Sequence, residues 1–133
     1  MLRELKLQSS FPWLIGGDLN EILYNFEKQG GPPKPQTILE SFKGTLKECD
    51  LYDLGFLGHK FTWWNRQSEA NSVEERLDRF CADSNYSSLF PYARFTHLDD
   101  DFSDHLPILL QTAKKQGVTA RKLDVTALRT SGL

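Results

Sequence analysis

The chain has 133 residues, the length of one globular domain, which excludes a multidomain organisation within this sequence. Hydrophobic residues make up 39% and charged residues 26% of it, which is enough apolar material for a core and excludes a disordered tail. The 16 Lys and Arg against 18 Asp and Glu leave a net charge of -2, so no overall positive field attracts nucleic acid, and any such contact must come from a local patch.

The N-terminal part of the chain is expected to hold a short helix, a buried strand and a loop. Leucines at helical spacing predict a helix over residues 2–7. The apolar run at residues 13–17, followed by an aspartate, predicts a strand whose C-terminal edge presents Asp18 and Asn20. Two glycines and three prolines predict a surface loop over residues 27–36.

The most regular helical pattern lies in residues 37–49. Thr37 and Glu40 have the spacing of a capping box, which places the start of a helix there. The apolar side chains that recur every three or four residues are Ile38, Leu39, Phe42, Leu46 and Cys49. We expect this apolar stripe to pack on a sheet while the opposite face stays in solvent.

Strands are predicted on both sides of a polar loop. Segments 51–56 and 60–65, separated by glycines, are expected to pair with each other, since the second is rich in aromatic residues that favour strands. Residues 66–75 are polar and predict a loop. Alternating polar and apolar residues over 76–80 favour a strand, although the preceding Ser-x-x-Glu pattern resembles the start of a helix.

A short helix and two more strands follow. Asp83 is placed to cap a helix that runs through Phe90 and ends before Pro91. The alternation over residues 94–98 and the apolar run at 107–110 predict the last two strands.

The remainder of the chain lacks a dense apolar face. From residue 112 onward the periodicity is weak. We therefore expect a partial domain over residues 1–111 and a loosely ordered C-terminal tail over residues 112–133.

The cysteines and the apolar stretches indicate a cellular location. Cys49 and Cys81 are too few for a disulfide scaffold and have no partners at zinc-ligand spacing, which favours reduced thiols. The apolar stretches are far shorter than the ~20 residues of a membrane span. The first residues alternate in charge and do not resemble a secretory signal. We expect an intracellular, non-secreted chain and leave the nucleus open.

Three polar groups stand at predicted junctions between strands and loops. They are Gly17-Asp18-Leu19-Asn20, Arg76-Leu77-Asp78-Arg79 and Ser103-Asp104-His105. Each group by itself is common in proteins of many kinds. Their order along the chain, together with the segments around them, is more specific.

In these segments the sequence resembles the endonuclease/exonuclease/phosphatase superfamily, and within it the endonuclease domains of plant LINE-type (non-LTR) retrotransposons. The similar segments are Gly-Asp-Leu-Asn at 17–20, the helix end and aromatic strand at 49–56 and 61–65, Leu-Asp-Arg at 77–79, and Ser-Asp-His-Leu-Pro-Ile at 103–108. The resemblance extends over residues 13–110.

The resemblance implies a fold class and an activity. The implied fold is α/β (α+β), the C-terminal half of a four-layer α/β sandwich of the DNase I-like type. The implied activity is hydrolysis of phosphodiesters in nucleic acid, by resemblance DNA, with Mg²⁺ or Mn²⁺ as cofactor. This reaction needs an activated water, a shield for the charge on the phosphate oxygens and help for the leaving alkoxide.

The same resemblance implies roles for five residues. His105 acts on the phosphate or on its water, and Asp78 bonds the far ring nitrogen of His105, which fixes the tautomer. Asp18 is implied as the general acid/base and Asn20 as a hydrogen-bond donor to the phosphate or the nucleophile. Asp104 is implied to help hold the metal.

Two apolar residues are implied in substrate binding. Trp63 and Leu77 fall where related enzymes line the nucleotide pocket, and an indole ring offers a stacking face. The alternative for Trp63 is core packing, because Trp63 and Trp64 alternate along one strand and one of them must face inward. His59 and His97 are expected to be ordinary sheet or loop histidines.

The sequence also departs from the superfamily. The residues that precede the Gly-Asp-Leu-Asn segment do not supply the early Asn and the Glu that hold the metal in complete members, so we expect a domain truncated at its N-terminus. A sheet without its covering partner exposes an apolar face, which favours self-association. We expect weak or no activity from the chain alone. The alternatives are a non-catalytic nucleic-acid or protein-interaction remnant, and a product of a decayed element with no molecular function.

Overall fold

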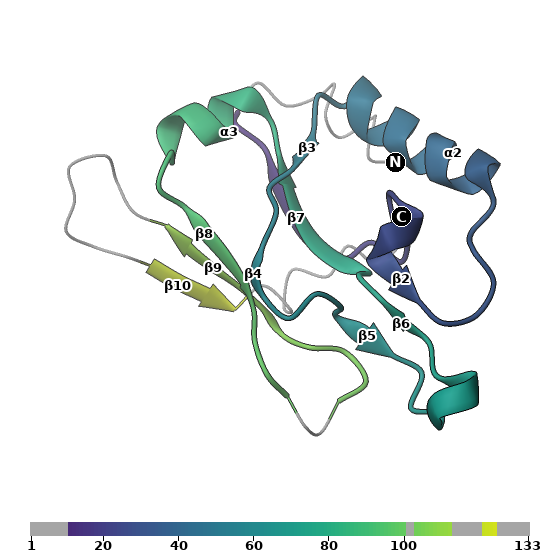
Figure 1. Cartoon of the computed structure of the whole chain (residues 1–133). Coiled ribbons are helices and arrows are strands. Elements are labelled where there is room, and N and C mark those ends of the chain that lie inside the picture. Colours follow the sequence, from purple (N-terminus) through teal and green to yellow (C-terminus); the bar gives the residue numbers. More distant parts are fainter. Residues whose placement is uncertain (1–10, 101–102, 113–120, 125–133) are drawn as a thin grey trace.

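The computed structural model describes residues 11–100, 103–112 and 121–124, and these form a mixed α+β fold (Figure 1). Within these ranges there are two α-helices and three small sheets, which confirms the coarse fold class expected from the sequence. The helices are α2 (Gln36–Glu48) and α3 (Ser84–Leu89), with the single-turn 3-10 helices η1 (Asn25–Glu27) and η2 (Glu69–Asn71). The strands are β1 (Leu14–Asp18), β2 (Lys28–Gln29), β3 (Tyr52–Asp53), β4 (Leu57–Gly58), β5 (Trp63–Trp64), β6 (Glu74–Glu75), β7 (Asp78–Ala82), β8 (Arg94–His97), β9 (Ile108–Thr112) and β10 (Arg121–Asp124).

The central sheet has the order β1-β7-β3, and β7 pairs antiparallel with both neighbours. All five residues of β7 are buried. Because side chains alternate along a strand, Cys81 points into a core cluster that includes Leu46 of α2, whereas Phe80 and Ala82 point into a second cluster with Phe95 of β8. In Figure 1, α2 lies on one side of β7, and β8 and β9 lie on the other. The central sheet is therefore covered on both faces.

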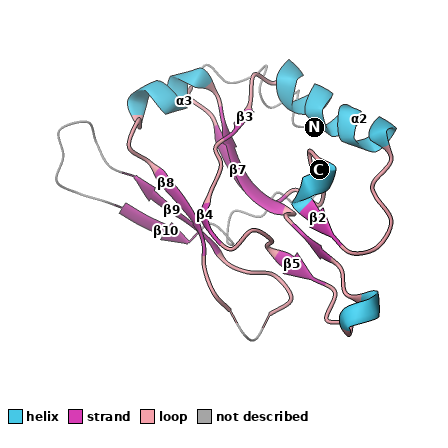
Figure 2. Cartoon of the chain, in the orientation of Figure 1, coloured by secondary structure: helices cyan, strands magenta, loops and turns pink. Residues whose placement is uncertain are grey.

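Two further sheets flank the central one. One has the order β10-β9-β8-β4, antiparallel except for the parallel pair of β4 and β8 (Figure 2). The other has the order β2-β6-β5 and is built from strands of two residues. In this small sheet Trp63 stands opposite Glu75, which ties the aromatic segment to the chain that leads into β7.

Most of the predicted elements are confirmed. The strands expected over 13–17, 76–80, 94–98 and 107–110 correspond to β1, β7, β8 and β9. The Asp83 side chain accepts a hydrogen bond from the backbone N–H of Tyr86 at 2.9 Å, so it caps α3 as predicted.

The predicted helix over residues 37–49 is confirmed as α2, but its predicted start is wrong. The helix begins at Gln36 after an N-cap at Pro35, where no side chain caps a backbone N–H. Thr37 therefore lies inside the first turn and is not the capping residue. Proline suits this position because its ring fixes φ, here at -59°.

The predicted pairing of segments 51–56 and 60–65 is also wrong. Their short strands join three different sheets: β3 pairs with β7, β4 with β8, and β5 with β6. Gly55 and Gly58 have φ angles of 74° and 96°, which turn the chain away from a simple hairpin. A Cβ atom at Gly58 would meet the His97 carbonyl oxygen at 2.4 Å, so only glycine allows β4 to lie against β8.

Two predictions fall wholly or mainly outside the described residues. The helix expected over residues 2–7 lies outside them. In the segment predicted as a tail, Thr112 ends β9, and residues 121–124 form β10, which pairs antiparallel with β9. The rest of that segment lies outside the described residues.

The described part of the chain contains no helix with the length and apolar character that a membrane span requires. Cys49 and Cys81 carry buried thiols and form no disulfide. Burial raises the pKa of Cys81 to about 12, and the charge of Asp53 adds to the effect.

Candidate active site

The structure brings together residues from the three polar groups singled out in the sequence. His105 lies between two carboxylates: its Nδ1 is 2.8 Å from Asp78 Oδ2, and its Nε2 is 3.8 Å from Asp18 Oδ2. Asp18 ends β1, Asp78 begins β7, and His105 lies in the segment before β9. Residues up to 87 positions apart in the sequence thus form one constellation.

The strand register places the two carboxylates side by side. Asp18 of β1 stands directly opposite Asp78 of β7 in the antiparallel pair. Side chains at facing positions lie on the same face of a sheet, so both aspartates point to the same side. Gly16 and Gly17, which precede Asp18, are buried beneath this position.

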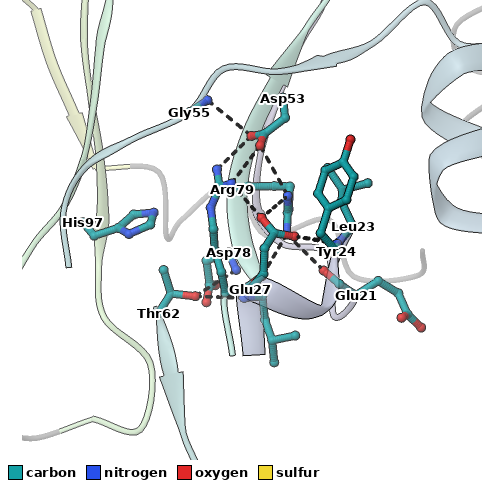
Figure 3. Close-up of polar contacts among 12 residues, drawn as sticks. Glu21, Leu23, Tyr24, Glu27, Asp53, Gly55, Thr62, Asp78, Arg79 and His97 are labelled. Carbon is teal, nitrogen blue, oxygen red and sulfur yellow. Dashed lines mark hydrogen bonds and ion pairs between the residues drawn. The ribbon is translucent and has the colours of Figure 1, made fainter. Parts of the chain in front are cut away.

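A buried threonine fixes the backbone of Asp78. The hydroxyl oxygen of Thr62 accepts hydrogen bonds from the N–H groups of Leu77 and Asp78, both at 3.0 Å (Figure 3). Thr62 is fully buried, so these bonds are shielded from water. These two hydrogen bonds fix the backbone at Leu77 and Asp78, where β7 begins.

The segment that carries His105 is attached to the aromatic strand. The Trp64 N–H donates to the Asp104 carbonyl at 3.0 Å, and the Leu106 N–H donates to the Thr62 carbonyl at 2.7 Å. The His105 N–H also donates to the Ser103 hydroxyl at 3.2 Å. These backbone bonds attach the segment that carries the His105 imidazole to the edge of β5.

The electrostatics favour a charged imidazole. The hydrogen bond that His105 donates to Asp78 raises the pKa of His105 above its usual value, and burial opposes this rise only in part. The negative charges of Asp78, Asp18 and Asp104 add to it. Because a carboxylate only accepts, Nδ1 carries the proton in the bond to Asp78, and Nε2 is the nitrogen that faces Asp18.

The constellation opens into a polar cleft of about 340 Å³. The cleft is lined by Gly17, Asp18, Asp78, Asp100, Ser103, Asp104, His105, Leu106 and Pro107. Asn20 is not among these residues. Its backbone N–H donates to Asp18 Oδ1 at 2.8 Å, and its φ of 59° places it in a tight turn beside the cleft. Asn20 is exposed, and it orients Asp18 through the backbone.

The donor set of the cleft fits a hard divalent cation. Carboxylates dominate the lining, and ligand atoms of Asp18, Asp78 and His105 lie within 4.8 Å of one another. Carboxylate oxygens with retained water are the ligands that Mg²⁺ and Mn²⁺ prefer. Asp104, which the resemblance implies as a metal ligand, also lines the cleft, but it is not one of the three residues whose ligand atoms lie this close together.

The two residues implied in substrate binding have different surroundings. Leu77 is buried in a cluster with Ile22 and Leu39, so its side chain packs in the core. Trp63 is half-buried, packs against that cluster and also lines a second cleft of about 420 Å³. This second cleft shares Asp100, Ser103, Asp104 and Leu106 with the first. Trp63 therefore belongs both to the core and to the site.

Sequence reasoning missed a buried ion-pair cluster of Glu27, Asp53, Arg76 and Arg79 behind the site (Figure 3). Arg76 donates to Asp53 at 2.7 and 2.8 Å, and Arg79 donates to Glu27 at 3.0 and 3.2 Å. Burial opposes ionisation of Asp53, but Arg76 and Arg79 hold the pKa of that carboxyl below its usual value. The sequence feature that could have revealed this cluster is the pair Arg76 and Arg79 on either side of Asp78. An arginine in a buried strand requires an acidic partner.

Comparison of the chain with protein-family models, with curated proteins and with solved structures found no match. No family is assigned to the chain by these comparisons. The functional proposal below therefore depends on the geometry of the cleft and on the motifs in the sequence.

Proposed function

We propose that this chain is the C-terminal half of a metal-dependent phosphodiester hydrolase that acts on nucleic acid, in the manner of a retrotransposon-type endonuclease. His105, held between Asp78 and Asp18 in a polar cleft, is the observation that carries the proposal. The layering of α2, the central sheet and the β8–β9 sheet is compatible with half of a four-layer DNase I-like sandwich. No part of this assignment depends on a family match.

Asp78, His105 and Asp18 have separate roles in moving protons and in offsetting the negative charge of the phosphate. Asp78 keeps the proton on Nδ1 and so directs Nε2 of His105 toward the cleft. A protonated His105 donates a hydrogen bond from Nε2 to a phosphate oxygen and offsets its negative charge. Asp18 is placed to accept a proton from the attacking water on the same side of the sheet.

A divalent cation held at Asp104 would supply further charge neutralisation at the phosphate and lower the pKa of a bound water. Asp100 and Asp104 also line the cleft. Without a cation these carboxylates repel a phosphate, so the proposal requires metal for phosphate to enter the cleft as well as for chemistry.

Nicking of supercoiled plasmid by the purified chain tests the proposal. We expect slow nicking in Mg²⁺ or Mn²⁺ and none in EDTA. His105→Ala and Asp18→Asn are expected to reduce the rate by about 10²–10⁴-fold, the usual value of one positioned proton-transfer group. Asp50→Asn is the matched control, since Asp50 is exposed and lies outside the cleft.

Each outcome bears on the proposal. Metal-dependent nicking that both cleft variants lose and Asp50→Asn keeps would support it. Nicking that survives in His105→Ala would overturn it. A folded chain that binds DNA without hydrolysing it in any metal would also overturn it, and would favour the non-catalytic interaction remnant.

A further inference from the structure

Two exposed aromatic rings are stacked on each other at the turn that follows β1. The ring centroids of Tyr24 and Phe26 lie 5.0 Å apart with an angle of 9° between the ring planes. Tyr24 is 46% exposed and Phe26 is 66% exposed. We call this pair the aromatic platform.

A lysine from α2 accompanies the platform. Lys43 Nζ lies 4.1 Å from the centroid of the Tyr24 ring, a cation–π contact. The same ammonium is 3.6 Å from the Glu40 carboxylate, which is exposed and so competes only weakly for it. One positive charge is therefore held against a flat aromatic surface.

Hydrogen bonds to the buried ion-pair cluster hold the backbone of the platform in place. Glu27 Oε1 accepts hydrogen bonds from the N–H groups of Leu23 and Tyr24, at 2.7 and 3.3 Å, while the same carboxylate is held by Arg79. In Figure 3, Tyr24 lies beside Glu27 at the edge of the ion-pair cluster. The helix η1, which carries Phe26 and has Tyr24 as its N-cap, is thus fixed to the core.

A second anchor holds the other side of the turn. The Asn25 side chain donates to the Lys34 carbonyl at 3.3 Å and accepts from the Lys34 N–H at 2.9 Å. These bonds fix the turn to the proline-rich loop. The two rings are consequently held in a set orientation, and Phe26 is the more exposed of the two.

We propose that the aromatic platform and Lys43 form a docking site for an unpaired segment of nucleic acid, an inference that rests on the proposed function and names where such a segment of the substrate is held outside the cleft. An unpaired base stacks on the exposed ring of Phe26, and Lys43 contacts the adjacent phosphate. Duplex DNA is a poor fit because its bases are already stacked and paired. A flat ring pair with a fixed ammonium matches a base and its phosphate, whereas most protein segments offer neither.

Fluorescence anisotropy with labelled oligothymidylate in EDTA tests the proposal without cleavage. We expect Phe26→Ala to raise the Kd by about 5- to 150-fold, the range of one lost base–aromatic stack. Lys43→Gln should reduce the salt slope of log K by about 0.7, the value for one phosphate of a single strand. Tyr92→Ala is the matched control, since Tyr92 is 56% exposed outside the platform.

A second probe separates stacking from charge. On an oligonucleotide of abasic sites, which keeps the phosphates and lacks the bases, the wild-type chain and Phe26→Ala should bind with equal affinity. Equal binding of oligothymidylate by Phe26→Ala and Tyr92→Ala would overturn the proposal, and so would a loss in Phe26→Ala that is the same on both probes. Self-association that Phe26→Ala abolishes, with oligonucleotide binding unchanged, would overturn it in favour of a protein surface.

Failure of this inference and failure of the proposed function give different results. Hydrolysis of bis(p-nitrophenyl) phosphate, a diester without bases, reports on the cleft alone, and Phe26→Ala should leave its rate unchanged. Unchanged oligonucleotide binding by Phe26→Ala with active hydrolysis would overturn only the platform. Absence of metal-dependent hydrolysis in the wild-type chain would overturn only the proposed function, because binding is measured in EDTA.

Discussion

Thr62 is a single residue on which the geometry of the cleft depends. Its hydroxyl oxygen accepts two backbone N–H groups at the start of β7, and its own carbonyl accepts from Leu106. One buried threonine therefore links the segment of Asp78 to the segment of His105. The polar side chain lies in an aromatic run that looks suited to packing alone, so nothing in the sequence indicated this role.

His97 is a second residue whose environment determines its behaviour. It is buried, its ring stacks on Phe56 at a centroid distance of 4.2 Å, and its Nδ1 donates to the His59 carbonyl at 2.5 Å. Burial lowers the pKa of His97 to about 4, with smaller effects from Arg76 and Arg79 in the same direction and from Asp78 in the opposite one. The structure agrees with the expectation of an ordinary sheet histidine.

We predict that His97 makes the folded state sensitive to acid. Its folded pKa lies below its unfolded value, so the unfolded chain binds the proton more readily. The stabilising contribution is complete above about pH 6.5 and is lost as the pH falls from there to about 4. This loss amounts to at most about 3 kcal/mol.

Urea unfolding followed by tryptophan fluorescence at pH 7 and at pH 4.5 measures this effect. His97→Gln should show a smaller difference in unfolding free energy between the two pH values than the wild-type chain. His59→Gln, which alters an exposed side chain and keeps the carbonyl that His97 needs, should retain the wild-type difference. Equal pH dependence in His97→Gln and the wild-type chain would contradict the prediction.

At the scale of elements, the ion-pair cluster joins four separate segments. Glu27 comes from η1, Asp53 from β3, Arg76 from the link before β7, and Arg79 from β7 itself. Both arginines are buried, and their guanidinium groups also lie near the rings of Phe56 and Phe42. The cluster holds the turn after β1 against the central sheet, and this turn carries the aromatic platform.

We predict that Glu27→Gln destabilises the fold by about 3–5 kcal/mol, because it leaves two buried arginines with one carboxylate. Glutamine keeps the shape of the Glu27 side chain and one acceptor oxygen, so the loss of stability measures the contribution of the negative charge. Glu40→Gln removes a carboxylate from an exposed pair with Lys43 and should change stability by less than about 1 kcal/mol. Chemical denaturation of the three proteins gives the comparison, and similar losses in both variants would rule out the assigned role.

At the scale of the whole molecule, the edge strand β4 is an exposed apolar feature. It is the last strand in the order β10-β9-β8-β4, and Leu57 within it is 56% exposed. Unpaired edges with apolar side chains are sites of association between chains. The sequence led us to expect self-association through an exposed sheet face, but the central sheet is covered on both faces, so this edge is a different place for it.

We predict concentration-dependent self-association that Leu57→Lys reduces, because an edge lysine opposes strand pairing between copies. Leu89→Lys is the matched control: Leu89 is 58% exposed but lies on α3 and not on a sheet edge. Sedimentation velocity over a wide range of protein concentration measures the effect. A wild-type chain that sediments as a monomer at every concentration would contradict the prediction.

The sequence determined the main local elements and the candidate catalytic residues. Periodicity predicted α2, β1, β7, β8 and β9, because each buries one face or both, and Asp83 marked the start of α3. The order of the polar groups also picked out Asp18, Asp78 and His105, which meet in one cleft. These features are encoded within a few neighbouring residues.

Only the tertiary structure decided how the short strands pair and which buried charges are neutralised. Strands of two residues carry too little pattern to choose a partner, so β3, β4 and β5 joined three sheets where one hairpin was predicted. Glu27 and Arg79, 52 positions apart, meet because the fold brings both into one buried cluster with Asp53 and Arg76. Local propensity acts over a few residues, whereas pairing and charge neutralisation depend on contacts that exist only after the chain has folded.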